Sequence, residues 1–576
     1  MEKETVRTTW RIAHLAALAF ACGGAAAQGQ FVQSPPLAQV VTTPVGTVAS
    51  GPVQVPIITW GGDIATILAN GNAKGTAKAS ILGKLGLNLR LSREDVFARQ
   101  LEAYLAGRSP YLRGTLGMIN MAAEAAGRDP RTKPVVIHQL TWSAGGDALV
   151  VRQSVRTTKD LKGKTVALQA YGPHVDYLSK ILADAGLTPK DVNLRWTADL
   201  TAGAKSPAAA LHDPKVDAAL VIIPDAMALT SAGTVGTGAE DSVKGARILL
   251  STKTANRIIA DVYAVRADYF QANRPEVEKF VRGLMQGEEA LRKLVAAKAS
   301  RGAEYKEVMA AAARELLDSP QALAEVEGMF QDAEFVAVAG NAAFFTRAEN
   351  PRNFATLNRE IQSAFVSLGL VARAAPLEHA QWDYRQFGAA ADVAAAPEAR
   401  RFDSDKVASM VARKQSQGRL GEGELFAFEV YFKPNQDKFT ADLYSDAFKR
   451  VVGLAATYGG AIITVEGHSD PMAYLRAKRD GSPEVVLGRT QQSAKNLSLS
   501  RAIAVRDSVI AYGRAQGVSL DPSQFAVIGH GITQPKTGVC GADPCAPKSE
   551  AEWQSNMRVE FRIIQVEAEA SAFKPL

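Results

Sequence analysis

The chain has 576 residues, more than one domain usually holds, so we expect two or three domains. Hydrophobic residues make up 47% and charged residues 22%, values that are ordinary for soluble globular proteins. Lysine and arginine number 66 against 59 acidic residues, which gives a formal net charge of +7. Because this excess is small and no basic run occurs, the composition does not indicate a nucleic-acid partner.

Residues 1–27 have the layout of a secretory signal peptide. A basic start and a short apolar core precede a small-x-small cleavage site: Lys3, Arg7 and Arg11, then Ile12–Cys22, then Ala25–Ala27. The apolar core is too short to span a bilayer, and a buried N-terminal helix is the alternative. Residues 19–22 also resemble a lipoprotein processing box, so lipidation at Cys22 is the alternative to cleavage after Ala27.

The chain has three cysteines, Cys22, Cys540 and Cys545. Cleavage after Ala27 leaves the last two, and we expect them to form a disulfide in an oxidising compartment. The ring is small, so the bond should stabilise the fold by roughly 2 kcal/mol. A metal site is the alternative, but His530 does not stand at a familiar zinc spacing, and we expect no metal.

Two segments with different composition follow. Residues 28–52 are rich in Gln, Pro, Thr, Ser and Gly without periodicity, which indicates a flexible leader. Residues 53–387 alternate strands with helices, which predicts a parallel, doubly wound α/β sheet, and their number predicts two lobes. The predicted strands are Val53–Thr59, Val135–Gln139, Lys164–Gln169 and Ala218–Ile223, and the predicted helices are Arg93–Ala106, His174–Ala185 and Pro275–Lys298.

Residues 388–423 are low in complexity and then polar and glycine-rich, which predicts an interdomain linker with a short helix near Ser404–Lys414. Residues 424–567 form the last predicted domain. Its first strand alternates strictly, with Phe426, Phe428 and Val430 on one face. The later elements complete a small α+β sandwich: helices at Thr440–Thr457 and Leu497–Tyr512, and strands at Ile462–Glu466, Phe525–Gly529 and Arg558–Val566.

Three motifs in this last domain occur in a fixed order: TVEGHSDP (464–471), NLSLSRAIAV (496–505) and NMRVEFRI (556–563). Together they resemble the OmpA/MotB-like peptidoglycan-binding domain. The resemblance implies that Asp470 and Arg501 bind diaminopimelate of the cell wall, and that Asn496 helps to fix the loop or the ligand. An insertion at Met472–Gln492 departs from the family pattern and could reshape the pocket.

The chemistry of Asp470 and Arg501 suits this ligand independently of the resemblance. Diaminopimelate presents an ammonium and a carboxylate on one carbon atom. A fixed carboxylate such as Asp470 accepts hydrogen bonds from the ammonium, and a guanidinium such as Arg501 donates two parallel bonds to the carboxylate. The alternative is a simple ion pair between Asp470 and Arg501, which would contribute little.

The N-terminal region carries a second set of motifs: GDALVV (146–151), TTKDLKGKTVALQAYGPHVDYLSKILADAGL (157–187) and KVDAALVIIPDA (215–226). These resemble the periplasmic solute-binding proteins of ABC importers, in the sulfonate, nitrate and thiamine-precursor class. The resemblance implies a two-lobed periplasmic-binding-protein fold of type II that closes on a small solute. The candidate residues of the cleft are Trp60, Gly61, Gly62, Asp63, Ser143, Asp147, Tyr171, His174 and Asp225.

Each candidate has a structural alternative. Trp60 could belong to the core, Asp63 and Asp225 could cap helices, and His174 could simply start a helix. If the acidic candidates line the cleft, they disfavour a simple oxyanion and favour a cationic or zwitterionic solute with an aromatic contact.

The sequence contains no Walker-type phosphate loop, no His-Glu-x-x-His motif and no complete nucleophile elbow, so we expect neither an enzyme nor a cofactor. The expected protein is periplasmic and attached to the cell wall, with the outer membrane as a further place of association. Its expected partners are peptidoglycan, a small solute and an ABC permease, in import or in sensing. A structural envelope anchor with a degenerate solute domain is the alternative.

Overall fold

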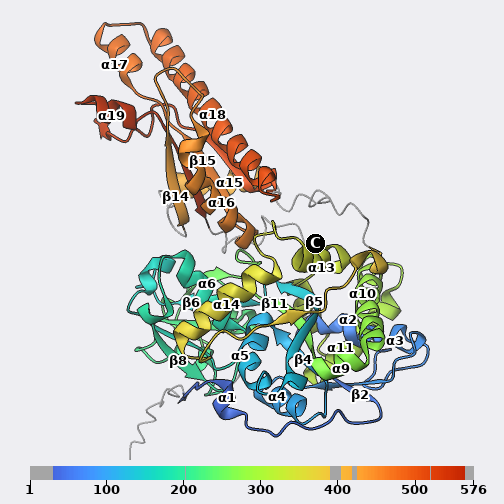
Figure 1. Ribbon diagram of the computed structural model, residues 1–576. Coiled ribbons are helices and arrows are strands. Elements are labelled where there is room, and N and C mark those ends of the chain that lie inside the picture. The colour runs from blue at the N-terminus through green and yellow to red at the C-terminus, as the bar shows by residue number, and fades with distance from the viewer. Residues whose placement is uncertain (1–29, 202, 389–403, 418–423, 519, 565–576) are drawn as a thin grey trace, which may run out of the picture.

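The computed structural model describes residues 30–201, 203–388, 404–417, 424–518 and 520–564 (Figure 1). The predicted signal peptide, residues 1–27, lies outside these ranges. The N-terminal region consists of two α/β lobes, and a smaller domain built from residues after 404 lies above it in the view of Figure 1. Within the described ranges, no helix is both long enough and apolar enough to cross a membrane.

Lobe 1 is built on a five-stranded sheet with the order β12-β5-β11-β4, and β13 pairs with β5. Its strands are β4 (Tyr111–Thr115), β5 (Pro134–Ser143), β11 (Ala260–Arg266), β12 (Ala333–Phe335) and β13 (Glu378–His379). A parallel pair, β2 (Val53–Ile57) and β3 (Leu89–Arg93), adjoins it. Its helices are α2 (Asp63–Ala69), α3 (Ile81–Lys84), α4 (Phe97–Leu105), α5 (Leu116–Ala126), α9 (Ala267–Ala272), α10 (Arg274–Ala296), α11 (Gly302–Leu317), α12 (Leu323–Asp332), α13 (Ala337–Thr346) and α14 (Phe354–Leu368).

Lobe 2 is built on a six-stranded sheet with the order β1-β8-β7-β9-β6-β10. Its strands are β1 (Phe31–Val32), β6 (Asp147–Val151), β7 (Thr165–Gln169), β8 (Asn193–Thr197), β9 (Ala218–Ile222) and β10 (Arg247–Ser251). Its helices are α6 (His174–Asp184), α7 (Pro207–Ala210) and α8 (Ile223–Leu229).

The two lobes agree with the expected architecture, but the expected parallel sheet is wrong, because both sheets are mixed. In lobe 2, β7 pairs in parallel with β8 and β9, whereas β6 pairs antiparallel with β9 and β10. The reason is connectivity: β6 enters lobe 2 from lobe 1, and β10 returns to lobe 1. A buried apolar strand has the same sequence pattern whether it runs parallel or antiparallel to its neighbours, so the sequence pattern does not reveal the strand direction.

Two crossovers connect the sheets of the lobes, in addition to residues 33–36, which run from β1 to α1. Residues 144–146 connect β5 to β6, and residues 252–259 connect β10 to β11. Thr252 is fully buried between them. Its Oγ1 accepts hydrogen bonds from the amides of Gly145 at 3.0 Å and Asp147 at 3.1 Å, so this one side chain ties the two crossovers together.

The described part of the expected leader, residues 30–52, differs from a flexible segment. Its β1 pairs antiparallel with β8 at the edge of the lobe 2 sheet. Helix α1 (Leu37–Val40) packs against α5 of lobe 1, and Leu37 and Val41 are buried. A two-residue strand and one helical turn are too short to show a period, so tertiary packing rather than local pattern orders them.

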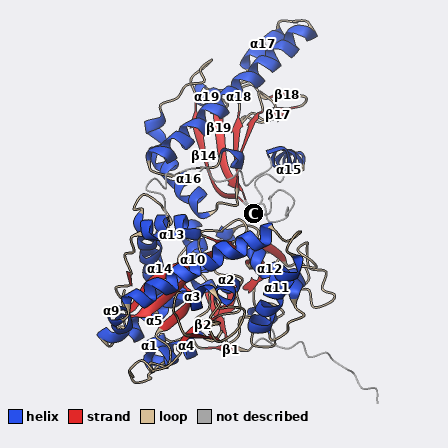
Figure 2. Cartoon of the chain, turned by 90° about the vertical axis from the view of Figure 1, so that its right-hand side faces the viewer, coloured by secondary structure: helices blue, strands red, loops and turns tan. Residues whose placement is uncertain are grey.

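The C-terminal domain is a small α+β structure on a four-stranded sheet with the order β14-β19-β15-β16. Its strands are β14 (Glu424–Tyr431), β15 (Ile462–Gly467), β16 (Phe525–Gly529) and β19 (Arg558–Ile564), and its helices are α15 (Ser404–Ser416), α16 (Ser445–Thr457), α17 (Met472–Arg479), α18 (Glu484–Ala515) and α19 (Glu550–Ser555). Val407, Met410 and Val411 of α15 pack against the sheet, and Figure 2 shows the strands between α15 and α16.

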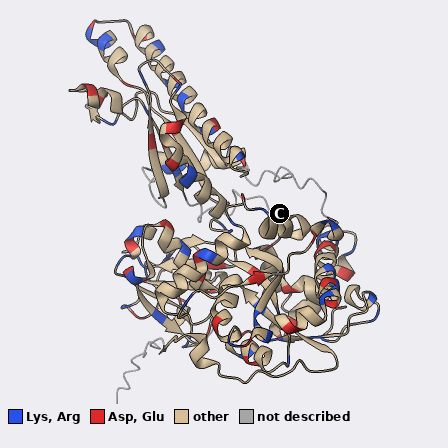
Figure 3. Cartoon of the chain, viewed as in Figure 1, with Lys and Arg blue, Asp and Glu red and all other residues tan. Residues whose placement is uncertain are grey.

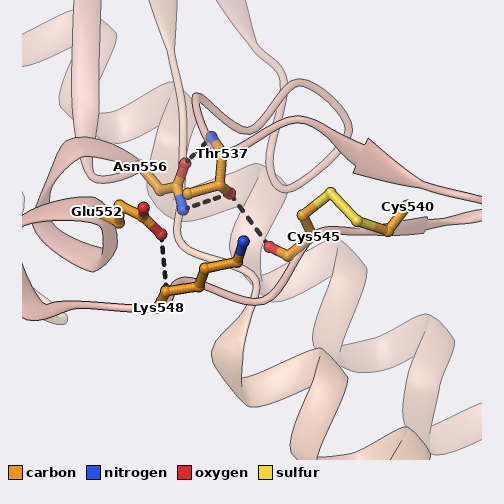
Figure 4. Close-up of a disulfide and its surroundings, with 6 residues drawn as sticks. All are labelled: Thr537, Cys540, Cys545, Lys548, Glu552 and Asn556. Carbon is orange, nitrogen blue, oxygen red and sulfur yellow. Dashed lines mark hydrogen bonds between the residues drawn. A yellow bond between two sulfur atoms is a disulfide. The ribbon is translucent and has the colours of Figure 1, made fainter.

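The insertion at Met472–Gln492 is helical, because it forms α17 and the first turns of the long helix α18. A disulfide joins Cys540 and Cys545 with an S–S distance of 2.07 Å (Figure 4). It links the short strands β17 (Val539–Cys540) and β18 (Asp543–Pro544), which pair antiparallel. Basic and acidic residues are interspersed along the chain in Figure 3.

Candidate functional sites

A cavity of about 560 Å³ lies between the two lobes. Lobe 1 contributes the turns that follow β2 and β3 and the start of α5, and lobe 2 contributes the turns that follow β7, β8 and β9. The crossover 252–259 contributes Ile259. This volume falls in the range of small-molecule sites, and a position between two lobes is a common one for such sites.

Four of the predicted cleft residues line this cavity: Trp60, Ser143, Asp147 and Tyr171. The indole N–H of Trp60 donates to Thr141 Oγ1 at 2.9 Å, which fixes the ring. A Cβ at Gly146 would lie 2.6 Å from the Trp60 ring, so only glycine allows the crossover to pass beside it.

Asp147 has its carboxylate engaged on both oxygens. Oδ2 accepts from the Ser143 hydroxyl at 2.6 Å, and Oδ1 lies 2.7 Å from Nε2 of His174. His174 is fully buried behind Asp147 and is not among the residues that line the cavity. It therefore orients Asp147 rather than facing a solute.

Asp63 does not line the cavity. It is fully buried, and its carboxylate pairs with Arg113, which also pairs with Asp261 at 2.8 Å. Burial raises the pKa of Asp63 to about 6, although Arg113 acts in the opposite direction. Gly61 and Gly62 are buried beside it, and a Cβ at Gly61 would lie 1.9 Å from the carbonyl oxygen of Met329.

Asp225 lies in the first turn of α8, also outside the residues that line the cavity. It is partly buried, and burial raises its pKa. Thr201, which does line the cavity, hydrogen-bonds with it. Asp225 therefore supports the rim of the cavity from behind.

Several cavity residues were not predicted from the sequence. They include the carboxylates Asp95, Asp199 and Asp261 and the apolar side chains Phe97 and Met118. Asp95 was missed because the sequence predicted one helix over Arg93–Ala106. In the structure a strand ends at Arg93 and a helix begins only at Phe97. The turn between them, at the end of a strand, is the signal that could have identified Asp95.

The charged residues that line the cavity are all acidic. Its charged lining residues are Asp95, Asp147, Asp199 and Asp261, and among the described residues that line it there is no lysine or arginine. Of these carboxylates, Asp261 is paired with Arg113 and burial raises its pKa. Asp95 accepts from the amide and hydroxyl of Thr59, and Asp199 is exposed.

In the C-terminal domain, Arg501 is 1% exposed and lies on α18 against the loop that follows β14. Its guanidinium donates to the main-chain oxygens of Gln436 at 2.8 Å, Lys433 at 3.1 Å and His468 at 3.2 Å. Burial lowers the pKa of Arg501 to about 10, and the carboxylate of Asp470 acts in the opposite direction. Three of its five N–H donors are thus engaged by the protein.

Asp470 lies just before α17, and its Oδ1 accepts from the amide of Met472 at 3.0 Å. No direct ion pair joins Asp470 to Arg501 in the described structure. The alternative of a simple ion pair between these two residues is therefore wrong. Asn496 is exposed on α18, and its side chain accepts from Gln492 Nε2 at 2.8 Å. Among the residues that the structure describes, no cluster of His, Cys, Asp and Glu is arranged to hold a metal ion.

Comparisons with known proteins give one family match. Residues 144–293 match the family model described as NMT1/THI5 like, and they cover lobe 2 except β1, together with β11, α9 and most of α10 of lobe 1. No curated protein sequence matches the chain.

Similar solved structures include two for the N-terminal region. The periplasmic aliphatic sulphonate binding protein SsuA from Escherichia coli has a TM-score of 0.40 and 16% identity over 57% of this chain and 90% of that chain. The alkanesulfonate-binding protein SsuA from Xanthomonas axonopodis pv. citri, bound to MOPS, has a TM-score of 0.38 and 18% identity over 57% and 97%. The peptidoglycan-associated lipoprotein from Burkholderia pseudomallei has a TM-score of 0.17 and 18% identity, covering 23% of this chain and 88% of that chain.

Proposed function

We propose that this protein is an envelope receptor that binds a small solute between its two lobes and is tethered to peptidoglycan by its C-terminal domain. The observation that carries the first half is the cavity of about 560 Å³, which draws its lining from both lobes. A solute that contacts both lobes stabilises the closed arrangement, because it gains contacts there that it lacks in an open one.

The charge of the cavity indicates the chemical class of the solute. Its charged lining groups are carboxylates, and the rings of Trp60, Phe97 and Tyr171 provide flat apolar surfaces. An anion would meet no fixed positive side chain there, whereas an ammonium group would meet Asp199 and the rings. We therefore propose a cationic or zwitterionic amine with an apolar body as the solute.

The test is a thermal-shift screen of the full chain with amines, amino acids, sulfonates and thiamine-like compounds. Binding to the folded state raises the melting temperature by an amount that grows with the logarithm of the ratio of ligand concentration to Kd. For an amine hit, Asp199→Asn should weaken binding by roughly two- to fivefold, the size expected for one exposed ion pair. Asp241→Asn is the matched control, because Asp241 is exposed, carries the same charge and lies outside the cavity.

A screen in which only sulfonates bind would overturn the proposed solute class while leaving a receptor. A screen in which nothing binds would favour the rival function, a structural anchor with a degenerate solute domain. If a receptor is found, an ABC permease is the proposed partner for import, and a signalling protein would take that place in sensing.

The second half of the proposal, wall binding, rests on Asp470 and Arg501. A diaminopimelate ammonium would bind Asp470, and its carboxylate would reach the two N–H donors of Arg501 that the main chain leaves unused. The protein would then be periplasmic, attached to the cell wall and close to the outer membrane.

A sedimentation assay with purified peptidoglycan tests this site. Asp470→Asn should abolish co-sedimentation of the full chain, while Asp480→Asn, an exposed aspartate at the other end of α17, should not change it. Arg501→Lys is the companion variant, because Arg501→Ala would remove the donor of three main-chain oxygens and lower stability as well. Full co-sedimentation of both Asp470→Asn and Arg501→Lys would overturn the assignment.

A further inference from the structure

We propose that the C-terminal domain docks on the crossover between the two lobes and thereby sets the lobe orientation, so that wall tethering and the solute cavity are coupled within one chain. The docking element is the loop Tyr458–Ala461, which connects α16 to β15. The surface that receives it is the crossover 252–259 together with the end of α6.

The loop is joined to the crossover by main-chain contacts. The amide of Gly460 donates to the carbonyl of Thr254 at 3.1 Å, and the amide of Arg257 donates to the carbonyl of Thr457 at 3.2 Å. A Cβ at Gly460 would lie 1.8 Å from the carbonyl oxygen of Lys253, so the approach requires glycine at this position. Such a close fit specifies one docked position.

Tyr458 anchors the loop to lobe 2. Its side chain is fully buried, and its hydroxyl donates to Asp184 Oδ2 at 2.9 Å at the end of α6. Arg450 of α16 donates to the main-chain oxygen of Asp184 at 3.3 Å. A buried tyrosine whose hydroxyl is satisfied by the partner surface is the kind of residue that dominates interface energies.

The C-terminal domain also contacts lobe 1. Its turn at Gly517 lies against Glu349, since a Cβ at Gly517 would be 2.4 Å from Glu349 Cγ. Arg352 of lobe 1 donates through Nε to the carbonyl oxygen of Arg257 at 2.8 Å, on the same crossover. The domain therefore touches both lobes and the segment between them, and rotation of one lobe against the other would break part of this contact set.

A short path connects this interface to the cavity. The crossover begins at Thr252, whose Oγ1 bonds Ser143 Oγ at 3.0 Å and accepts from the amides of Gly145 and Asp147. Ser143 and Asp147 line the cavity. Two states of the lobes would differ in their contacts at both ends of this path. Docking of the C-terminal domain must therefore change the equilibrium constant of cavity closure by the same factor by which closure changes the equilibrium constant of docking.

Hydrogen exchange on the full chain, without any solute, tests the coupling. Gly460→Ala should speed exchange at residues 254–257 and also at the amides of Gly145 and Asp147, which do not contact the C-terminal domain. We expect about a tenfold increase, the change in opening equilibrium for one lost buried hydrogen bond. Gly453→Ala on α16 is the matched control, because a Cβ there meets nothing within 4 Å.

Two outcomes overturn the proposal. Faster exchange at 254–257 alone means that the domain docks without coupling, and unchanged exchange at both places means that it does not dock. Tyr458→Phe, which removes only the bond to Asp184, should shift both places in the same direction by a smaller factor, and it decides the matter if Gly460→Ala does not fold. Since no solute is added, failure of the receptor function would leave this result unchanged.

Discussion

Asp176 should make the stability of the two-lobed region depend on pH. It lies in the first turn of α6 in lobe 2, is 3% exposed, and faces Gly117 at the start of α5 in lobe 1. Neither carboxylate oxygen has a hydrogen-bond partner of good geometry within the described structure. Burial raises its pKa from 3.8 to about 7; the backbone amides of Asp176 and Tyr177 act in the opposite direction, and the carboxylates of Asp261 and Asp147 add to the rise.

The sign follows from proton linkage. The folded state holds this proton more tightly than the unfolded state, so the stability that it contributes is fully present below pH 3.8 and is lost as the pH rises to about 7. A shift of that size corresponds to about 4 kcal/mol between the ends of the range. Asp176 packs against the other lobe, so opening of the lobes would hydrate its carboxylate. Hydration would remove part of the desolvation cost of ionising this group.

The perturbation is Asp176→Asn, which keeps the shape and removes the charge. At pH 8 the variant should be more stable than the parent by up to about 4 kcal/mol, and at pH 4 the two should be nearly equal. Urea unfolding at pH 4, 6 and 8 measures this difference. Asp241→Asn, an exposed aspartate in lobe 2, is the control that should follow the parent. Parallel pH profiles for Asp176→Asn and the parent would refute the reasoning.

Two further predictions concern groups whose partners the structure shows. Arg113→Met should lower the free energy of unfolding by about 3–5 kcal/mol at pH 7, because Asp63 and Asp261 lose their buried counter-charge, and the loss should shrink as acid protonates them. Replacing Cys540 and Cys545 by serine should lower the unfolding free energy of the C-terminal domain by only about 2 kcal/mol, as measured by urea titration, and peptide mapping of the parent should find the two linked.

The sequence by itself determined most of the local structure. Alternation at Phe426, Phe428 and Val430 predicted the strand that became β14, and the apolar run after Lys215 predicted β9. Helical spacing predicted α6 and α10 nearly to the residue. These features are determined locally, because burial of one face of a strand or helix leaves a period in the sequence.

Only the tertiary structure decided which polar residues face the cavity and which direction each strand runs. Asp63 and Asp147 look alike in sequence, but Arg113 of β4 pairs with the first, while His174 orients the second toward the cavity. Arg501 is likewise engaged by carbonyl groups of a distant loop. Such partners come from segments that meet only after folding, and a single sequence carries no local pattern that brings them together.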